Sequence, residues 1–280
     1  MKDFLVVSNK EKDPENKVAG SIKEYLDARE CICSCRCVTH DNVSRDELEK
    51  AVDEGAECVL VLGGDGTLIQ VAGALAGKDI PLLGINLGTL GYLAEVERDH
   101  IIPTLESLIE DRYDVEERMM LSVETKGIRQ EALNDMVITR LGDLRVVRYK
   151  LYVNGRCLTT YEADGIIVST PTGSTGYNLS AGGPIVEPSA SMILVTPICP
   201  HTLNSRPVVL SAEDIVRIEV CESKYKHDRE AYVSCDGSSP VSLAAGDAVD
   251  IRRSESITKI IKMSKEGFLD ILSRKLRTTG

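Results

Sequence analysis

The order of hydrophobic and polar residues follows two rhythms along the chain, and the rhythm changes near Met119. Before that residue, short apolar runs alternate with stretches whose apolar residues recur at helical spacing. The apolar runs predict strands at 4–8, 31–38, 58–62 and 80–85. The helical spacing predicts helices at 17–29, from a capping box at 44–47 onward, up to Ala76 after the third strand, and at 99–111. This alternation is typical of a parallel sheet covered by helices, so we expect an α/β, Rossmann-like N-terminal domain.

The second rhythm consists of short strand-like runs that follow one another closely, at 120–124, 136–140, 146–153, 166–169, 192–196, 208–210, 215–221, 231–235 and 249–252. Asn154-Gly155, between stretches of alternating apolar and polar residues, is a strong hairpin signal. We expect an all-β, sandwich-like C-terminal domain. Helical spacing returns at 265–277, where a last helix is expected to pack back on the first domain. The predicted domains are therefore 1–116 plus 256–280, and 117–255.

Composition restricts the class of protein. A hydrophobic content of 42% supplies a full core, and the net charge of −11 argues against a general binder of nucleic acid or of anionic membranes. No apolar stretch approaches membrane-spanning length, and the start at 1–7 lacks the features of a signal peptide. We expect a cytoplasmic protein with no nucleic-acid or membrane partner, whose nine cysteines stay reduced.

Cys31, Cys33, Cys35 and Cys37 alternate along one predicted strand. On an extended strand they share one face, with successive residues about 6.6 Å apart. Thiolates on one metal ion lie closer together than that. The pattern favours a half-buried strand that uses cysteine as a small apolar residue. A redox or metal-binding role is the alternative.

A glycine-rich turn, Gly63-Gly64-Asp65-Gly66, joins the predicted buried strand 58–62 to a predicted helix. It is not a Walker A loop, because no Gly-Lys-Ser/Thr follows, and Ile69 stands where the dinucleotide fingerprint needs its third glycine. Its position still favours a phosphate site over an ordinary turn. An acid repels phosphate, so Asp65 is explained best if it faces a hydroxyl to be deprotonated or a metal ion.

A second candidate is the segment 163–184, where a predicted strand runs into a turn rich in hydroxyls and glycines. Its hydroxyls can donate to base and phosphate atoms, and Tyr177 can stack on a base. The alternative is a structural turn with satisfied hydroxyls. Asn134-Asp135 could hold ribose hydroxyls, although such a pair is also common in turns. The histidines form no zinc spacing or Ser-His-Asp set.

Five segments together resemble the NAD kinase family and occur in its order. They are Gly-Gly-Asp-Gly-Thr-Leu at 63–68, Asn-Leu-Gly-Thr-Leu-Gly-Tyr-Leu at 86–93, Asn-Asp at 134–135, Asp-Gly-Ile-Ile-Val-Ser-Thr-Pro-Thr-Gly-Ser-Thr-Gly-Tyr at 164–177, and Pro-His-Thr-Leu-Asn-Ser-Arg-Pro at 200–207. The first segment alone is shared with diacylglycerol kinases and phosphofructokinases. The fourth is the most specific.

The resemblance implies transfer of a phosphoryl group from ATP, or from polyphosphate, to the adenosine-ribose 2′-hydroxyl of NAD, with Mg²⁺ present. It implies that Asp65 is the general base. No residue is assigned as a metal ligand. Family members are usually homodimers or homotetramers. The implied binding roles place Gly66 at the phosphates, Asn134 and Asp135 at the nicotinamide ribose, Asp164 at the nicotinamide amide, Arg145 near the dinucleotide, and Thr175, Gly176, Tyr177 and Ser180 at the adenine. Glu162, Asn178 and Leu179 complete the implied binding set.

Some residues depart from the family pattern. Many members have Arg at the positions of Glu162 and Gln70, Gln near Ser238, and Ala at Gly176. These changes affect donor handling and fine specificity more than the reaction. Two alternatives remain: a kinase acting on a lipid or sugar hydroxyl, and a non-catalytic NAD(P) sensor.

Overall fold

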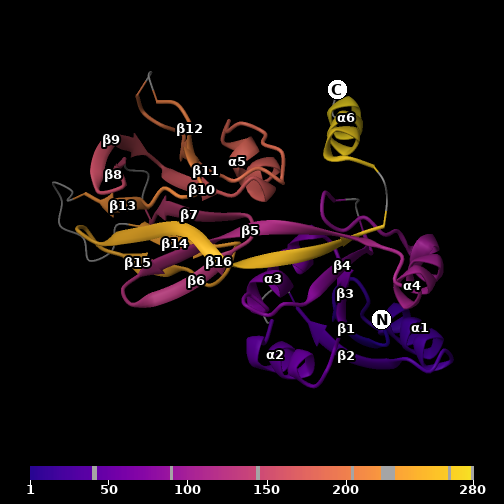
Figure 1. Cartoon of the computed structure of the whole chain (residues 1–280). Coiled ribbons are helices and arrows are strands. Elements are labelled where there is room, and N and C mark those ends of the chain that lie inside the picture. The colour runs from indigo at the N-terminus through magenta and orange to yellow at the C-terminus, as the bar shows by residue number, and fades with distance from the viewer. Residues whose placement is uncertain are drawn as a thin grey trace. The chain divides into compact units, whose positions relative to one another are not determined.

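A computed structural model describes residues 1–39, 43–88, 91–142, 146–202, 205–221, 231–263 and 266–278. The chain divides into two compact units. Unit 1 comprises Met1–Arg118 and Ile257–Gly280, and unit 2 comprises Met119–Ser256. The chain leaves unit 1 within strand β5 (Asp114–Thr125) and returns to it within strand β16 (Ala248–Lys262), as Figure 1 shows.

Unit 1 is built on a parallel sheet, as the sequence predicts. Its strands lie in the order β2-β1-β3-β4, and the last part of β16 pairs in parallel with β4 through Lys259 and Ile260. The strands are β1 (Asp3–Asn9), β2 (Ile32–Val38), β3 (Cys58–Gly63) and β4 (Pro81–Asn86). The helices are α1 (Lys17–Asp27), α2 (Arg45–Asp53), α3 (Asp65–Ala74) and α4 (Ile101–Ile109), the last preceded by the 3-10 helix η1 (Arg98–His100).

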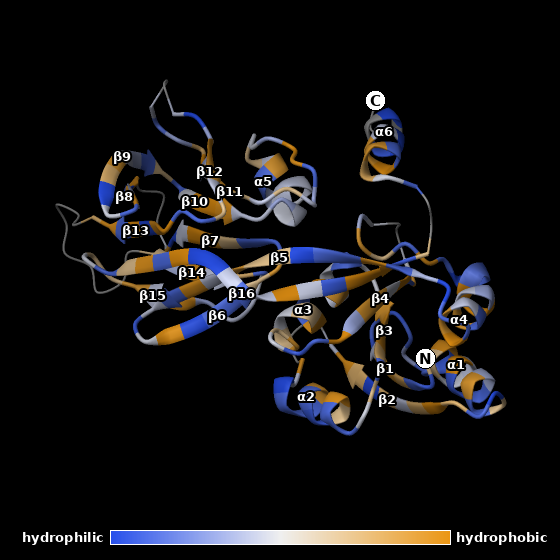
Figure 2. Ribbon diagram, viewed as in Figure 1, coloured by the Kyte–Doolittle hydropathy of each residue, from blue (hydrophilic) through white to orange (hydrophobic). Residues whose placement is uncertain are grey.

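Helices cover both faces of this sheet, which explains the unbroken apolar runs of its strands. Alternate strand residues such as Phe4 and Leu60 share one core cluster with α1 and α4, whereas α3 packs on β3 and β4 and contacts α2. Figure 2 shows hydrophobic residues gathered on these strands and on the inner sides of the helices. Helix α2 begins at the predicted place, because Ser44 caps it: the Ser44 hydroxyl accepts a hydrogen bond from the Glu47 N–H. None of the described helices is long and apolar enough to cross a membrane.

The cysteine-rich strand β2 lies at the edge of the unit 1 sheet. Cys31 and Cys33 are buried in the core cluster, Cys35 is partly buried, and Cys37 is exposed. In the part of the chain that the structure describes, no three His, Cys, Asp or Glu side chains are close enough to bind one metal ion. The packing of the first two cysteines agrees with a half-buried strand.

Unit 2 is a β-sandwich, which confirms the predicted class. One sheet contains the first part of β16, then β13 (Val216–Val220), β8 (Val147–Val153) and β9 (Arg156–Ala163). The other sheet has the order β12 (Val208–Ser211), β11 (Met192–Ile198), β10 (Gly165–Ser169), β7 (Asp135–Arg140), β14 (Ala231–Cys235) and β15 (Val241–Leu243). The short strand β6 (Ile128–Ala132) pairs with β5. Residues from the inner faces of both sheets form one buried cluster.

The predicted hairpin joins β8 to β9, and Asn154 and Gly155 adopt φ angles of 51° and 76°. Strand β9 itself was not predicted, because its alternation is hidden by polar residues on an edge strand. Strand β16 runs for 15 residues, whereas the sequence predicted a strand only at 249–252. The prediction was too short because charged residues interrupt the apolar pattern of this strand. The last helix, α6 (Phe268–Thr278), belongs to unit 1, as expected.

Candidate active site

The glycine turn of unit 1 lies where the parallel strands end. Strand β3 ends at Gly63, which pairs with Asn86 at the end of β4, and helix α3 begins at Asp65. A Cβ on Gly63 would lie 2.5 Å from the Thr67 hydroxyl, so only glycine fits there. That hydroxyl accepts a 2.9 Å hydrogen bond from the Asn9 amide at the end of β1. The turns after β1 and β3 are therefore linked directly.

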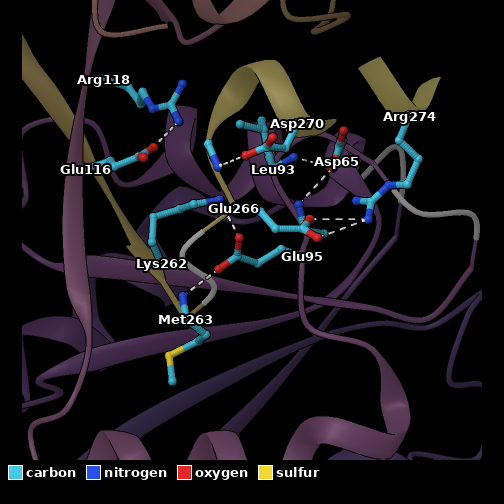
Figure 3. Close-up of polar contacts among 12 residues, drawn as sticks. Asp65, Leu93, Glu95, Glu116, Arg118, Lys262, Met263, Glu266, Asp270 and Arg274 are labelled. Atoms are coloured by element: carbon cyan, nitrogen blue, oxygen red, sulfur yellow. Dashed lines mark hydrogen bonds and ion pairs between the residues drawn. The ribbon is translucent and has the colours of Figure 1, made fainter. Parts of the chain in front are cut away.

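The Asp65 carboxylate binds a neighbouring backbone segment. Its Oδ1 accepts hydrogen bonds from the N–H groups of Leu93 at 3.0 Å and Ala94 at 2.9 Å, and its Oδ2 accepts one from Tyr92 at 2.6 Å. Figure 3 shows Asp65 beside Leu93. A Cβ on Gly91 would lie 1.9 Å from Oδ1, so this glycine allows the backbone to approach the carboxylate. Since a carboxylate offers about four lone-pair sites, Oδ2 keeps one for another donor.

The same edge of the sheet carries a cation that the sequence analysis did not single out. Lys12 follows β1, is exposed, and has no ion-pair partner among the described residues. Its Nζ lies 3.7 Å from the position that a Cβ on Gly88 would take. Gly66, in the first turn of α3, has open space around it. The N–H groups at the start of a helix and a nearby ammonium group suit a phosphate.

In unit 2, the residues predicted to bind ribose lie at one end of the second sheet. Asp135 begins β7 and pairs with Ser169 at the end of β10. The Asn134 carbonyl accepts hydrogen bonds from the Thr170 N–H and the Ser169 hydroxyl. Asn134 Oδ1 is buried and has no hydrogen-bond partner among the residues that the structure describes. A buried acceptor without a partner is costly unless a ligand or water meets it, so its position favours a binding role.

The hydroxyl-rich turn after β10 packs tightly against this pair. It contains a 3-10 helix, η2 (Thr172–Thr175), and a short helix, α5 (Tyr177–Ser180). A Cβ on Gly173 would lie 2.2 Å from the Asn134 carbonyl oxygen. A Cβ on Gly176 would lie 3.7 Å from the Asn134 amide nitrogen and 4.0 Å from an Asp135 oxygen. The structure thus brings Gly176, Asn134 and Asp135 together.

For two residues of this turn, the structure suggests a role that the sequence did not. Thr172 was not singled out, yet its buried hydroxyl has no hydrogen-bond partner in the described part of the chain. Asn178 was expected to bind the dinucleotide, but its buried amide donates to Ser174 and Pro184 carbonyls and accepts from the Thr196 hydroxyl. Asn178 therefore supports the turn from inside. Thr175 and Gly176 are partly exposed, and Tyr177, Leu179 and Ser180 are exposed.

Asp164 precedes β10 and so lies at the other end of that strand from Asp135. Its carboxylate accepts a 3.1 Å hydrogen bond from Arg140, a partner that sequence reasoning missed. Glu162 is exposed, and Arg145 lies outside the described residues. Partial loss of hydration raises the pKa of the Tyr177 phenol, and the charges of Cys199, Tyr232, Asp135 and Asp164 raise it further, in decreasing order.

Two carboxyl groups of unit 2 have strongly raised pKa values. Burial raises the pKa of Asp135 to about 6. Burial also raises the pKa of Asp236 to about 7, against the opposing effect of hydrogen bonds from backbone N–H groups. Perturbed carboxyl groups gather at functional sites more often than elsewhere, so this end of the sheet is a candidate site on electrostatic grounds as well.

Comparison with known proteins identifies both parts of the chain. The ATP-NAD kinase N-terminal domain model matches residues 4–113, and the ATP-NAD kinase C-terminal domain model matches residues 133–263. The NAD kinase of Lachnospira eligens is 42% identical and covers 99% of this chain and 100% of its own length. The NAD kinase of Agathobacter rectalis is 43% identical and covers 99% of each chain.

Solved structures have the same architecture. An NAD kinase from Archaeoglobus fulgidus in complex with ATP superposes with a TM-score of 0.80 at 26% identity, covering 99% of this chain and 100% of that one. Yeast NADH kinase complexed with NADH superposes with a TM-score of 0.86, covering 98% and 87%. At 23% identity, the second likeness shows the fold alone.

An α/β unit with a carboxylate in its glycine turn, joined to a β-sandwich unit, defines a class of two-domain phosphotransferases. Matches to both domain models, and relatives above 40% identical over nearly their whole length, narrow this class to one family. The chain belongs to the NAD kinase family. The resemblance found in its motifs is thereby confirmed.

Proposed function

We propose that this chain transfers the γ-phosphoryl group of ATP to the adenosine-ribose 2′-hydroxyl of NAD and so makes NADP. Its membership of the NAD kinase family supports this, as does the ATP bound in the related Archaeoglobus fulgidus structure. The observation that carries the proposal is the carboxylate of Asp65 within the glycine turn at the start of α3. That turn supplies an acceptor for a hydroxyl proton next to N–H groups that suit phosphate.

Asp65 acts as the general base in this proposal. Its Oδ1 is already occupied by two N–H donors, whereas Oδ2 accepts one. Oδ2 is therefore the oxygen that takes the proton of the attacking 2′-hydroxyl as its oxygen bonds to the γ-phosphorus. The bond from that phosphorus to the β,γ-bridging oxygen breaks, and ADP leaves. The backbone bonds fix the orientation of the carboxylate, so no rotation of the side chain is needed at the moment of transfer.

The donor phosphates meet the glycine turn and Lys12. The first-turn N–H groups of α3, including that of Gly66, donate to phosphate oxygens, and the ammonium group of Lys12 offsets their charge. The described residues include no cluster of three metal-binding side chains. A Mg²⁺ ion at this site would be held by the donor phosphates, and Asp65 is the carboxylate of this turn that could join them. When bound, Mg²⁺ neutralises charge on the transferring group.

Unit 2 holds the dinucleotide in this proposal. Asn134 and Asp135 accept hydrogen bonds from the nicotinamide ribose, and Asp164 binds the nicotinamide amide. Thr175, Gly176, Tyr177 and Ser180 line the adenine, and the unpartnered hydroxyl of Thr172 joins the polar contacts to the dinucleotide. Asn178 acts indirectly, by holding the turn that carries these residues.

We further propose that the enzyme works in the cytoplasm as a homodimer or homotetramer. Light scattering coupled to gel filtration tests the assembly. A mass equal to one chain of 30.6 kDa at assay concentration would contradict it.

The central experiment measures NADP formation by the purified chain, with ATP or polyphosphate as donor and NAD or NADH as acceptor. We expect D65N to lower kcat by roughly 10²-fold or more while calorimetry still detects NAD binding. D46N, which alters a first-turn aspartate of α2 outside the proposed site, is the matched control and should keep wild-type activity.

Three other results would contradict the proposal. A kcat of D65N equal to that of the wild type would show that Asp65 is not the general base. Label transferred from ATP to a lipid or sugar, but not to NAD, would show a different acceptor. NAD binding without any turnover would show a sensor.

A further inference from the structure

Asp236 binds the backbone of the segment that carries the proposed ribose-binding residues. Its Oδ2 accepts the Leu133 N–H at 2.6 Å, and its Oδ1 accepts the N–H groups of Asn134 at 3.0 Å and Asp135 at 2.9 Å. The Asp236 N–H in turn donates to the Asp135 carbonyl at 2.9 Å. These contacts span about a hundred residues of sequence and fix three successive peptide groups.

The backbone at Asp236 is shaped to aim the carboxylate at this segment. Strand β14 ends at Cys235, which pairs with Met136, and a tight turn follows. Asp236 and Gly237 have φ angles of 49° and 71°, and the Ser238 N–H donates to the Cys235 carbonyl at 2.8 Å. Positive φ is unfavourable for an aspartate, so the turn accepts backbone strain at this residue. Such strain persists only where surrounding contacts fix it, as the N–H groups do here.

The arrangement leaves the neighbouring side chains available for a ligand. Asp236 uses only the backbone N–H groups of Asn134 and Asp135. Asn134 Oδ1 has no hydrogen-bond partner among the described residues, and Asp135 is buried. A ribose hydroxyl could donate to either side chain without breaking a bond to Asp236.

We propose that Asp236 is the positioning residue of the NAD site: it holds Asn134 and Asp135 in the geometry that receives the ribose. The inference rests on the proposed function, in which these two residues bind the nicotinamide ribose. That ribose does not react, since the phosphoryl group goes to the adenosine ribose. Loss of the Asp236 contacts should therefore weaken NAD binding in the ground state and the transition state alike, and leave kcat nearly unchanged.

The test compares D236A with D236N. D236A removes every acceptor, and the KM for NAD should rise on the order of 10- to 100-fold, with kcat within about twofold. In D236N one amide oxygen can still accept from Asn134 and Asp135, while the amide nitrogen opposes the Leu133 N–H. Its KM should lie between those of D236A and the wild type. The KM for ATP should not change.

D247N is the matched control. Asp247 also accepts a backbone N–H in a turn of unit 2, from Ala244 at 2.6 Å, and it pairs with Lys126. That turn follows β15, whose Leu243 pairs with Ala231 at the opposite end of β14 from Asp236. D247N should lower the unfolding temperature and leave the KM for NAD unchanged. A purely structural role for Asp236 would give D236A and D247N the same kinetic behaviour.

Other outcomes are equally distinct. If wild-type protein makes no NADP, the proposed function fails, whatever the variants do. If the wild type is active and N134A keeps the parental KM for NAD, the role of Asn134 fails and this inference with it. If N134A raises that KM but neither D236N nor D236A does, Asp236 is not the positioning residue. Should D236A not fold, D236N alone decides between these results.

Discussion

At the scale of single residues, Asp65 in unit 1 and Asp236 in unit 2 both hold a backbone segment in place through a carboxylate. Each carboxylate accepts hydrogen bonds from three successive backbone N–H groups, those of residues 92–94 and 133–135. A carboxylate is the side chain best suited to this, since it accepts several hydrogen bonds and donates none when ionised. Both turns are thereby fixed before a substrate arrives, which reduces the entropy lost on binding.

Gly91 tests whether the backbone must approach Asp65 closely. In G91A, a Cβ would lie 1.9 Å from the Asp65 carboxylate, so the segment or the carboxylate must move. We expect a loss of about 1–3 kcal/mol in the free energy of unfolding. We also expect kcat to fall about tenfold or more, because the base is displaced. Denaturant unfolding and NADP formation measure the two effects.

G20A provides the control for Gly91. Gly20 lies in α1 with open space around it, so alanine should be neutral or slightly stabilising there. Unchanged kcat in G91A would show that the contact between this segment and Asp65 is dispensable.

Substitution of Lys12 tests the proposed contact between its ammonium group and the phosphates of ATP. K12M keeps the length of the side chain and removes the charge that we place beside the donor phosphates. The KM for ATP should rise about five- to tenfold, and the KM for NAD should stay within twofold. K17M is the control, because Lys17 is exposed and pairs with Glu15 at the start of α1. Equal KM values for ATP in K12M and the wild type would exclude the proposed phosphate contact.

At the scale of elements, α6 and the end of β16 support the segment that Asp65 binds. The Tyr92 and Phe268 rings lie 6.4 Å apart, and the Lys275 ammonium group lies 3.9 Å from the centre of the Tyr92 ring. Glu95 accepts hydrogen bonds from the Lys262 ammonium group and the Met263 N–H (Figure 3). A cavity of about 560 Å³ lies between this segment, α4 and α6. The helix is therefore held by a few contacts over incompletely filled space.

These contacts predict that α6 affects catalysis through Tyr92. F268A removes the ring beside Tyr92 and should lower kcat about three- to tenfold, because the segment at Asp65 becomes less well fixed. L269A is the matched control, since Leu269 is the next residue of the same helix and is 70% exposed. NADP formation and thermal unfolding compare the two variants. Identical kcat values would show that α6 does not act on the site.

Periodicity in the sequence predicted the elements that bury a continuous apolar face. The parallel strands of unit 1, the hairpin at Asn154-Gly155 and the helix after Gly66 all follow from local pattern and turn chemistry. Local pattern failed for β9 and for most of β16, where charged and polar residues occupy long strands. Such strands form because neighbouring strands pair with them, and that information lies elsewhere in the chain.

The candidate site was predictable only in part, for a related reason. Glycines, hydroxyls and acids in turns indicated Asp65, Asn134 and the segment 163–184. The N–H groups that meet Asp65 lie 27–29 residues away, and those that meet Asp236 lie about a hundred away. A bond from a side chain to a distant backbone leaves no periodic trace in the sequence. Asn178 shows the opposite error: it belongs to a motif that suggests ligand binding, but its side chain forms hydrogen bonds inside the turn.

At the scale of the whole molecule, a rise in pH should lower the free energy of unfolding but strengthen NAD binding. The pKa values of Asp135 and Asp236, about 6 and about 7, lie above the ordinary value of 3.8. Between pH 3.8 and 7 the folded state therefore holds more protons on these groups than the unfolded state. Their contribution to the free energy of unfolding decreases as pH rises through this window. Stability from these groups is greatest at the acidic end.

NAD binding should follow the opposite course. A protonated Asp236 cannot accept three N–H hydrogen bonds as a carboxylate does, so the Leu133–Asp135 segment is held fully only when Asp236 is ionised. We expect the KM for NAD to fall several-fold between pH 6 and pH 8 in the wild type. Asp135 titrates in the same range, and Glu131 and Cys235 lie close enough to be coupled electrostatically. The contribution of Asp236 to the pH dependence of KM must therefore be measured as the difference between the wild type and a variant in which residue 236 does not titrate.

D236N supplies that difference, because its amide does not titrate. Relative to the wild type, its KM for NAD should depend less on pH, and its free energy of unfolding should decrease less between pH 5 and pH 7.5. Both profiles are measured at constant ionic strength, by NADP formation and by urea unfolding. Parallel wild-type and D236N profiles would show that Asp236 does not titrate in this range. A wild-type KM that rises with pH would contradict the sign of the coupling, since ionisation would then weaken the site that it is expected to hold together.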